Sequence, residues 1–474
     1  MRRIITPERM RAVEQAFMGK TATLGIVLME RAARAVADVA LQMTVRGALV
    51  LCGPGNNGGD GYGVARLLHE AGRQVWIWTL SNPEMLRGDA LANMRRCQEM
   101  KLPIRRLFTM PEDPPEGCGV VVDALFGTGL QRPLTELYGE AVAWINASRL
   151  KVLAVDMPSG MGEAMVRADR TVTFHQRKPC HLLSPGRECA GVVTVADIGI
   201  LQDESSEDYL CLEAADIPGM LPPRPPDAHK GTCGHALVVA GSLGMAGAAA
   251  LCAGGALRGG AGLVTVCCPE EILGTVQGLV PCAMCVSQME MSQALPGKRS
   301  VAVGPGLGRN EVADALLPVL LEAEAPQVWD ADALNWLAEQ DVGLDSRFII
   351  TPHPGEAARL LHVSVTEVVR DPLEAARLLH EKYGAVTVLK GATTVIVDQD
   401  RRALSPFGTP GMATGGSGDV LTGVIAALLA QGIAPFEAAW LGAYLHGCAG
   451  EAAAARHGIR SMTAQDLLAS LRID

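Results

Sequence analysis

The residues best placed to do chemistry lie in a glycine-rich stretch near the C-terminal end of the chain. The segment GTPGMATGGSGDVLTG spans residues 408–423 and runs into an apolar stretch, Val420 to Leu429, that is typical of a buried helix. Backbone amides at the start of a helix, together with the helix dipole, favour a bound anion. The pattern therefore predicts a phosphate site formed by Gly415, Gly416, Ser417 and Gly418.

Asp419 directly follows these residues, at the mouth of the predicted phosphate site. A carboxylate beside a phosphate is unfavourable unless it has a task, such as taking a proton from an attacking hydroxyl. The alternative is an ordinary helix cap with an acidic first turn. Such a cap does not require three glycines among four consecutive residues, which cost chain entropy. We therefore predict that Asp419 is a general base for phosphoryl transfer.

A second group of polar residues follows three apolar strands in the N-terminal half, expected at Ala48 to Cys52, Gly119 to Asp123 and Val152 to Asp156. In a parallel sheet these loops share the carboxyl edge, where α/β sheets bind ligands. Asn57, Asp123 and Ser159 together offer one carboxylate, one amide and one hydroxyl, a set that suits a weakly charged cation. The alternative for Asp123 and Asp156 is that each caps the turn after its strand.

The elements around these loops predict an α/β protein. Helices are expected at Pro7 to Phe17, with Thr6 as N-cap, and at Ile26 to Met43. Continuous apolar strands that alternate with helices indicate a parallel sheet covered on both faces. In the C-terminal half a strand is expected at His235 to Ala240, and VTVLKGATTVIVD is typical of two strands joined by a polar loop. That loop offers a lysine and hydroxyls to a nucleotide.

Composition narrows the class of protein. The 474 residues are too many for one ordinary core, and five prolines crowd residues 218–226. We expect one domain at 1–217, a proline-rich linker at 218–227 and a second domain at 228–474. A net charge of −10 argues against binding nucleic acid, and no apolar stretch is long enough to span a membrane. Thirteen scattered cysteines indicate reduced thiols, so we expect a cytoplasmic protein.

The motifs GPGNNGGDG, VVDALFGTGL and AVDMPSG, in this order, resemble the N-terminal epimerase domain of the NAD(P)H-hydrate repair enzymes. The resemblance implies a Rossmann-like three-layer domain that interconverts the R and S forms of hydrated NADH and NADPH, with potassium held by Asn57, Asp123 and Ser159. It makes Asp156 the acid/base residue. The segment after Gly160 is shorter than is usual in the family. The implied substrate contacts are Asn56, Asn57, Gly58, Gly59, Asp60, Gly127, Thr128, Gly129, Leu130, Gln131, Arg132, Pro133 and Asp156.

The C-terminal half resembles the ADP-dependent NAD(P)H-hydrate dehydratases, which have a ribokinase-like fold. The resemblance rests on TPHPGE, KGATT and the glycine-rich segment, and covers nearly all of residues 228–474. It implies Mg²⁺, ADP as co-substrate, and Asp419 as the base. The implied contacts to the hydrated cofactor are Ala248, Gly306, His353 and Asp419. Those to the nucleotide are Lys390, Gly391, Ala392, Thr393, Thr394, Gly415, Gly416, Ser417 and Gly418.

Together the two resemblances imply a metabolite-repair enzyme that epimerises hydrated NAD(P)H and dehydrates the S form, producing AMP and phosphate. Two other classes share these features. One is a small-molecule kinase of the ribokinase-like fold, which would release a phosphorylated product. The other is a module that binds a nicotinamide metabolite without turnover. For the enzyme we expect small-molecule substrates and a homo-oligomer.

Overall fold

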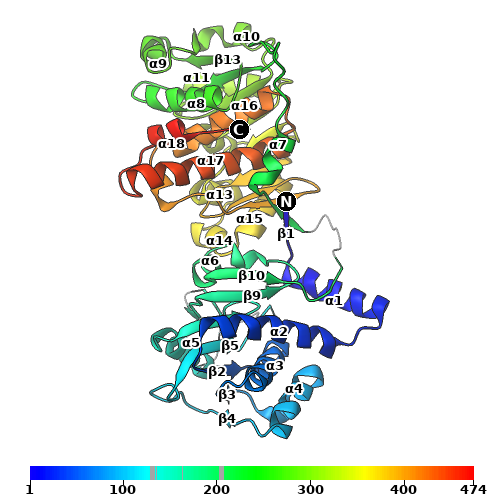
Figure 1. Ribbon diagram of the computed structural model, residues 1–474. Coiled ribbons are helices and arrows are strands. Elements are labelled where there is room, and N and C mark those ends of the chain that lie inside the picture. Colours follow the sequence, from blue (N-terminus) through cyan, green and yellow to red (C-terminus); the bar gives the residue numbers. More distant parts are fainter. Residues whose placement is uncertain (129–133, 135, 163, 202–207, 474) are drawn as a thin grey trace. The chain divides into compact units, whose positions relative to one another are not determined.

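The computed structural model describes residues 1–128, 134, 136–162, 164–201 and 208–473 (Figure 1). It contains two compact units, Arg3–Asp208 and Tyr209–Asp474, and the second also includes Met1–Arg2. The units divide ahead of the expected linker at 218–227, because β11 (Tyr209–Cys211) already pairs in parallel with β20 (Arg402–Ser405). The expected linker begins inside the short helix α7 (Ile217–Met220). Pro218 fits there because the first turn of a helix needs no N–H donor.

The first unit is built on a parallel seven-stranded sheet, as the sequence predicts. The expected strands at Ala48, Gly119 and Val152 are all present. The order across the sheet is β10 (Val192–Ala196), β9 (Arg170–Phe174), β6 (Lys151–Val155), β5 (Cys118–Ala124), β2 (Gly47–Cys52), β3 (Val75–Thr79) and β4 (Ile104–Arg106).

Helices cover both faces of this sheet, which gives three layers. Ala48, Val50 and Cys52 pack with one group of helices, while the alternate residues Leu49 and Leu51 pack with α5 (Glu136–Ala147). Thr6 caps α1 as expected, since its side chain accepts a hydrogen bond from the Arg9 amide. The first group comprises α1 (Pro7–Thr21), α2 (Gly25–Met43), α3 (Asn56–Glu70) and α4 (Gly88–Glu99).

The segments after β6 are short. The chain following Gly160 forms a small hairpin of β7 (Gly160–Met161) and β8 (Ala164–Met165). The helix α6 (Gly186–Cys189) lies between β9 and β10.

The second unit is built on an eleven-stranded sheet. Among the pairings described, all are parallel except those of β19, which runs antiparallel to β18 and β20. The two strands expected on either side of the KGATT loop are therefore confirmed. The order is β1 (Arg2–Ile4), β11, β20, β19 (Thr394–Val397), β18 (Val386–Leu389), β17 (Phe348–Ile350), β16 (Gln327–Trp329), β15 (Ser300–Val303), β12 (His235–Val239), β13 (Leu263–Cys268) and β14 (Met284–Ser287).

Two helices pack unusually closely in this unit, α8 (Ala246–Arg258) and α16 (Ser417–Ala430). A side chain at Gly423 would come 1.9 Å from the Cys252 carbonyl oxygen, so only glycine allows the approach. The expected apolar helix over Val420 to Leu429 is confirmed. The other helices are α9 (Leu273–Leu279), α10 (Met291–Ala294), α11 (Glu311–Leu321), α12 (Asp332–Leu337), α13 (Pro354–Leu361), α14 (Val365–Arg370), α15 (Pro372–Tyr383), α17 (Pro435–His457) and α18 (Ala464–Ser470).

Among the described residues, no helix combines the length and the apolar character needed to cross a bilayer.

Candidate active sites

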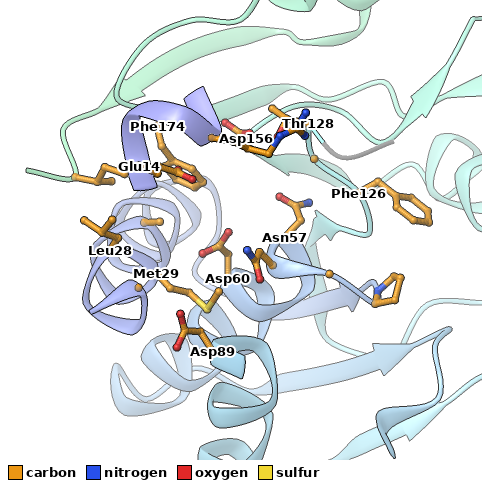
Figure 2. A pocket seen from close by; sticks show the side chains of 18 of the residues that line it. Glu14, Leu28, Met29, Asn57, Asp60, Asp89, Phe126, Thr128, Asp156 and Phe174 are labelled. Carbon is orange, nitrogen blue, oxygen red and sulfur yellow. The ribbon is translucent and has the colours of Figure 1, made fainter. Parts of the chain in front are cut away.

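A cavity of about 590 Å³ lies at the carboxyl edge of the seven-stranded sheet (Figure 2). It is lined by the loops that follow β2, β5 and β6, together with residues of α1 and α2. Of the residues implied as substrate contacts, it brings together Asn56, Asn57, Asp60, Gly127, Thr128 and Asp156. Gly58 and Gly59 are buried in α3 instead. Gly129, Leu130, Gln131, Arg132 and Pro133 lie outside the described residues.

The three residues implied as cation ligands come from three separate loops. Asp123 is fully buried, and its carboxylate accepts hydrogen bonds from the Ser159 amide (2.8 Å) and the Ser159 hydroxyl (2.7 Å). Asn57 lies beside the same loops, since a side chain at Gly127 would come 3.0 Å from its Oδ1. Burial raises the pKa of Asp123 to about 6, although hydrogen bonds from Ser159 and Leu125 oppose this. Asn57 Nδ2 is buried and has no hydrogen-bond partner among the described residues.

Asp156 forms a buried ion pair with Lys178. The lysine Nζ lies 2.6 Å from Asp156 Oδ1 and also donates to Thr173 Oγ1 and the Phe174 carbonyl. Burial alone would raise the pKa of Asp156, but the charge and hydrogen bond of Lys178 hold it below its ordinary value. Asp156 also adopts a positive φ of 63°. Its side chain is therefore fixed and ionised at the wall of the cavity.

His181 supports the backbone of Asp156. Its Nε2 lies 2.9 Å from the Asp156 carbonyl oxygen, and its Nδ1 accepts a hydrogen bond from the Lys178 amide. Burial, aided by the charge of Lys178, lowers the pKa of His181 to about 4. The ring is consequently neutral, with its proton on Nε2, and fixes the turn from which Asp156 projects.

In the second unit, Asp419 lies in the first turn of α16. Gly416 is the N-cap residue that precedes the helix, its φ of 94° favours glycine, and no side chain caps the first amides of the helix. An anion could therefore accept those amides' hydrogen bonds. Burial, the charge of Asp330 and, more weakly, those of Asp332 and Glu356 raise the pKa of Asp419 to about 7, while Lys390 opposes them. A carboxyl group that titrates near neutrality is suited to proton transfer.

Lys390 connects the nucleotide loop to this helix. Its Nζ lies 2.7 Å from Asp330 Oδ1 and 4.0 Å from Glu356 Oε2. The other oxygen of Asp330 accepts a hydrogen bond from Thr422 of α16 at 2.8 Å. A side chain at Gly418 would meet Lys390 Nζ at 3.3 Å, so the lysine lies directly beside the start of α16.

Four residues that the resemblance implies as nucleotide contacts follow Lys390 along the loop. Gly391 and Ala392 are exposed, Thr393 is buried and Thr394 begins β19. In the glycine-rich segment, Gly415 is exposed, whereas Ser417 is buried and its hydroxyl has no hydrogen-bond partner among the described residues. His446 holds the adjacent backbone, with its Nε2 at 2.8 Å from the Ser417 carbonyl oxygen.

Two of the residues implied to meet the hydrated cofactor, Ala248 and Gly306, lie in contact. Ala248 lies in the first turns of α8, and a side chain at Gly306 would come 2.9 Å from its Cβ. In the loop of Gly306, the Gly308 amide donates a hydrogen bond to Asp332 at 2.9 Å. Asp332 is one of the carboxylates whose charge raises the pKa of Asp419. His353 has a structural task as well, because its Nδ1 accepts from the Gly355 and Glu356 amides and caps α13.

Several residues at these sites were not predicted from the sequence. In the first unit they are Glu14 and Lys178, and in the second unit Asp330, Glu356 and Thr422. Asp330 and Lys178 each follow a strand of a parallel sheet, β16 and β9, so the strand-end rule that identified Asp123 could have found them. Glu14 lies on α1 and carries no comparable signal.

Comparison with known proteins covers both units. A family model described as NAD(P)H-hydrate dehydratase matches residues 236–472, and one described as YjeF-related protein N-terminus matches residues 25–180. The bifunctional NAD(P)H-hydrate repair enzyme of Coxiella burnetii is 40% identical over 90% of this chain and 89% of its own length. The chain belongs to the family of bifunctional NAD(P)H-hydrate repair enzymes. Its Escherichia coli relative of the same name is 36% identical over 95% of this chain and 90% of its own length.

Two solved structures support the fold of the second unit. The ADP/ATP-dependent NAD(P)H-hydrate dehydratase from Bacillus subtilis, co-crystallised with ATP and Mg²⁺, matches with a TM-score of 0.50 and 33% identity. The match covers 54% of this chain and 94% of that one. A ribokinase-like superfamily protein from Enterococcus faecalis matches with a TM-score of 0.51 and 26% identity, over 57% of this chain and 96% of its own. The predicted ribokinase-like architecture is thereby confirmed.

Proposed function

We propose that this chain repairs hydrated NADH and NADPH, with the first unit interconverting the R and S epimers and the second dehydrating the S form. The observation that supports the second step best is Asp419. It has a pKa of about 7 and lies at the uncapped start of α16, beside Lys390. A base, a set of free amides and a cation in one place are what phosphoryl transfer to a hydroxyl requires.

The dehydration follows from the chemistry of the substrate. Hydroxide is a poor leaving group, so the hydroxyl of the reduced ring must first be converted into a better one. Asp419 takes the hydroxyl proton while the terminal phosphoryl group of ADP is transferred to the oxygen. The amides of residues 415–418 stabilise charge on the moving group. The transfer leaves AMP. Phosphate then departs from the ring, driven by the lone pair of the ring nitrogen, and loss of a proton from the neighbouring ring carbon restores the double bond of NAD(P)H.

The second unit has a suitable place for Mg²⁺. Asp330, Asp332, Glu356 and Asp419 outnumber the one lysine among them, and the burial of Asp330 and Glu356 makes this excess of negative charge unfavourable. One or two carboxylates together with nucleotide phosphates are the ligands that Mg²⁺ prefers. When bound, the ion would neutralise the phosphates of the nucleotide. The side chains that we propose to hold it are Asp332 and Glu356.

The first unit offers a fitting site for potassium. Asp123 is buried, no basic side chain among the described residues offsets its charge, and Ser159 and Asn57 add uncharged oxygens. Among the described residues of both units, no group of three or more histidine, cysteine or carboxylate side chains is arranged to hold a metal ion. A single carboxylate with amide and hydroxyl oxygens suits a large monovalent ion. We propose that it offsets the charge of the substrate phosphates.

Asp156 is the proposed acid/base residue of the epimerase. It projects into the cavity and is held in position by Lys178 and Thr173. The loops after β2 and β5, which include Asn56 and Thr128, would hold the dinucleotide.

The test for the second unit is the recovery of NADH absorbance from enzymatically hydrated NADH. ADP and ATP are compared as donors, and the products are separated by chromatography. We expect one AMP and one phosphate for each NADH formed with ADP. A stable phosphoester of the substrate, with no NADH recovered, would contradict the proposal and favour a small-molecule kinase.

A further inference from the structure

Glu14 is a carboxylate in the first-unit cavity to which the proposed chemistry assigns no task. It lies on α1, is half-buried and lines the same cavity as Asp156. Within the part of the chain that the structure describes, its side chain makes no hydrogen bond or ion pair. Surface glutamates of neighbouring helices differ in this respect, since Glu30 and Glu70 are both paired with Arg66. A half-buried carboxylate that lines a cavity and has no partner among the described residues is free to meet a ligand.

Glu14 belongs to a cluster with two other carboxylates. Figure 2 shows Glu14 entering the cavity beside Phe174, while Asp156 enters from the end of β6 and Asp60 from α3. Burial raises the pKa of Glu14, and although the charge of Lys178 opposes this, that of Asp156 adds to it. Asp156 has the opposite tendency, because Lys178 keeps it ionised. Catalytic acid and base pairs are commonly two carboxyl groups, one with a raised pKa and the other with a lowered pKa.

We propose that Glu14 is the second acid–base residue of the epimerase site and serves the face of the reduced ring that Asp156 does not reach. The inference rests on the proposed epimerase function. It is motivated by the reaction, because inversion at the hydroxylated carbon requires a hydroxyl to leave on one face and water to enter on the other. A single carboxylate held rigidly by Lys178 can attend to one face only.

In the proposed reaction, Glu14 supplies the proton that one water takes away and Asp156 receives the proton of the other. Glu14 gives a proton to the ring hydroxyl, which departs as water while the lone pair of the ring nitrogen forms a carbon–nitrogen double bond. A second water adds to the carbon from the face of Asp156 and gives its proton to that carboxylate. Each inversion therefore breaks one C–O bond, forms another and moves one proton from Glu14 to Asp156. No oxidant or reductant is consumed, and the reverse reaction exchanges the two roles.

The experiment compares Glu14→Gln and Asp156→Asn in the full-length chain, without ADP, so that no dehydration interferes. Glu140→Gln, an exposed carboxylate on α5, is the matched control. Epimerisation of purified R and S NADH hydrates is measured by chromatography. Exchange of the ring hydroxyl oxygen with ¹⁸O-labelled water is measured by mass spectrometry for each epimer. Calorimetric titration with NADH hydrate reports binding.

We expect Glu14→Gln to slow epimerisation by about 100-fold or more, which is the usual effect of losing an acid–base group. Binding should stay within about threefold of the wild type, because glutamine keeps the size of the side chain. Oxygen exchange should persist in the one epimer whose hydroxyl faces Asp156 and be lost in the other. Asp156→Asn should reverse which epimer still exchanges. A merely structural role for Glu14 would not produce this one-sided pattern.

Two results would overturn the assignment of Glu14 alone. One is epimerisation by Glu14→Gln within about threefold of the control. The other is equal loss of exchange from both epimers together with weakened binding. A wild-type chain that interconverts neither epimer would instead refute the proposed epimerase function, and Glu14 with it. Glu14→Asp distinguishes misfolding from lost chemistry, since a shortened carboxylate should restore part of the activity.

Discussion

Replacing Asp419 with asparagine should abolish dehydration and at the same time stabilise the second unit. Asparagine has nearly the same size as aspartate but cannot accept the hydroxyl proton at neutral pH. The removal of a general base typically costs about 100- to 10,000-fold in rate. We expect epimerisation by the same variant to be unchanged, because Asp419 does not line the cavity of the first unit.

The gain in stability follows from the pKa of Asp419. It is raised from 3.8 to about 7 by burial and by the neighbouring carboxylates. A group with a raised folded-state pKa binds more protons in the folded than in the unfolded chain, so stability falls as the pH rises from about 4 to 7. At about 1.36 kcal/mol per pKa unit, the upper limit of this loss is about 4 kcal/mol. Solvent access to Asp419 reduces the expected gain in Asp419→Asn to about 1–3 kcal/mol.

The assay is urea unfolding of the wild type and Asp419→Asn at pH 8 and pH 5, followed by tryptophan fluorescence. The variant should be more stable at pH 8, and its advantage should shrink at pH 5, where the wild-type carboxyl group is protonated in the folded chain. Asp314→Asn, on the exposed side of α11, is the control and should show no such dependence on pH. Dehydration within about threefold of the wild type would remove Asp419 from the role of base. If the difference in unfolding free energy between Asp419→Asn and the wild type were the same at pH 8 and pH 5, the raised pKa of Asp419 would be refuted.

Three further predictions concern the first unit and the division of the chain. Epimerisation should increase with potassium, and Asp123→Ala should weaken that dependence without affecting the ADP-driven reaction; equal rates with and without potassium would exclude the cation site. Lys178→Met should leave Asp156 buried without its counter-charge and destabilise the first unit by about 3–5 kcal/mol. It should also raise the pKa of Asp156, so that epimerisation requires a higher pH, and an unchanged pH profile would refute the role of the ion pair. The boundary expected from the sequence predicts that fragments 1–217 and 225–474 are each folded and active, but fragment 225–474 lacks β11, a strand of the second unit's sheet. The compact units divide after Asp208, so fragments 3–208 and 209–474 should be compared with the first pair. If either fragment were soluble only when co-expressed with its partner, the two cores would depend on each other.

The sequence was most informative where function depends on strand ends. Asp123 and Ser159 could be placed together because parallel strands deliver their following loops to one edge, and the structure brings them into contact. Asp419 was identifiable because the glycines before it and the apolar run after it define a helix start.

Other parts of the sites depend on strand order, which the sequence pattern does not encode. Lys178 reaches Asp156 because β9 lies beside β6, and Asp330 reaches Lys390 across 60 residues of chain. Glu14 enters the cavity because α1 packs across the edge of the sheet, a tertiary contact without a local signal. The start of the second unit at Tyr209 was hidden for a similar reason, since the three residues of β11 form a strand by pairing between β1 and β20 in the larger sheet.

We propose that this one chain converts both the R and the S epimer of hydrated NADH back to NADH. The most direct test supplies a mixture of R and S NADH hydrates with ADP and follows NADH absorbance to completion. We expect the wild type to recover both epimers and Asp419→Asn to recover neither. With Asp156→Asn, only the S hydrate should be converted rapidly to NADH. The remaining NADH should then form at the rate of uncatalysed epimerisation. A wild-type chain that stops at the S share, or that recovers NADH without converting ADP to AMP, would contradict the account.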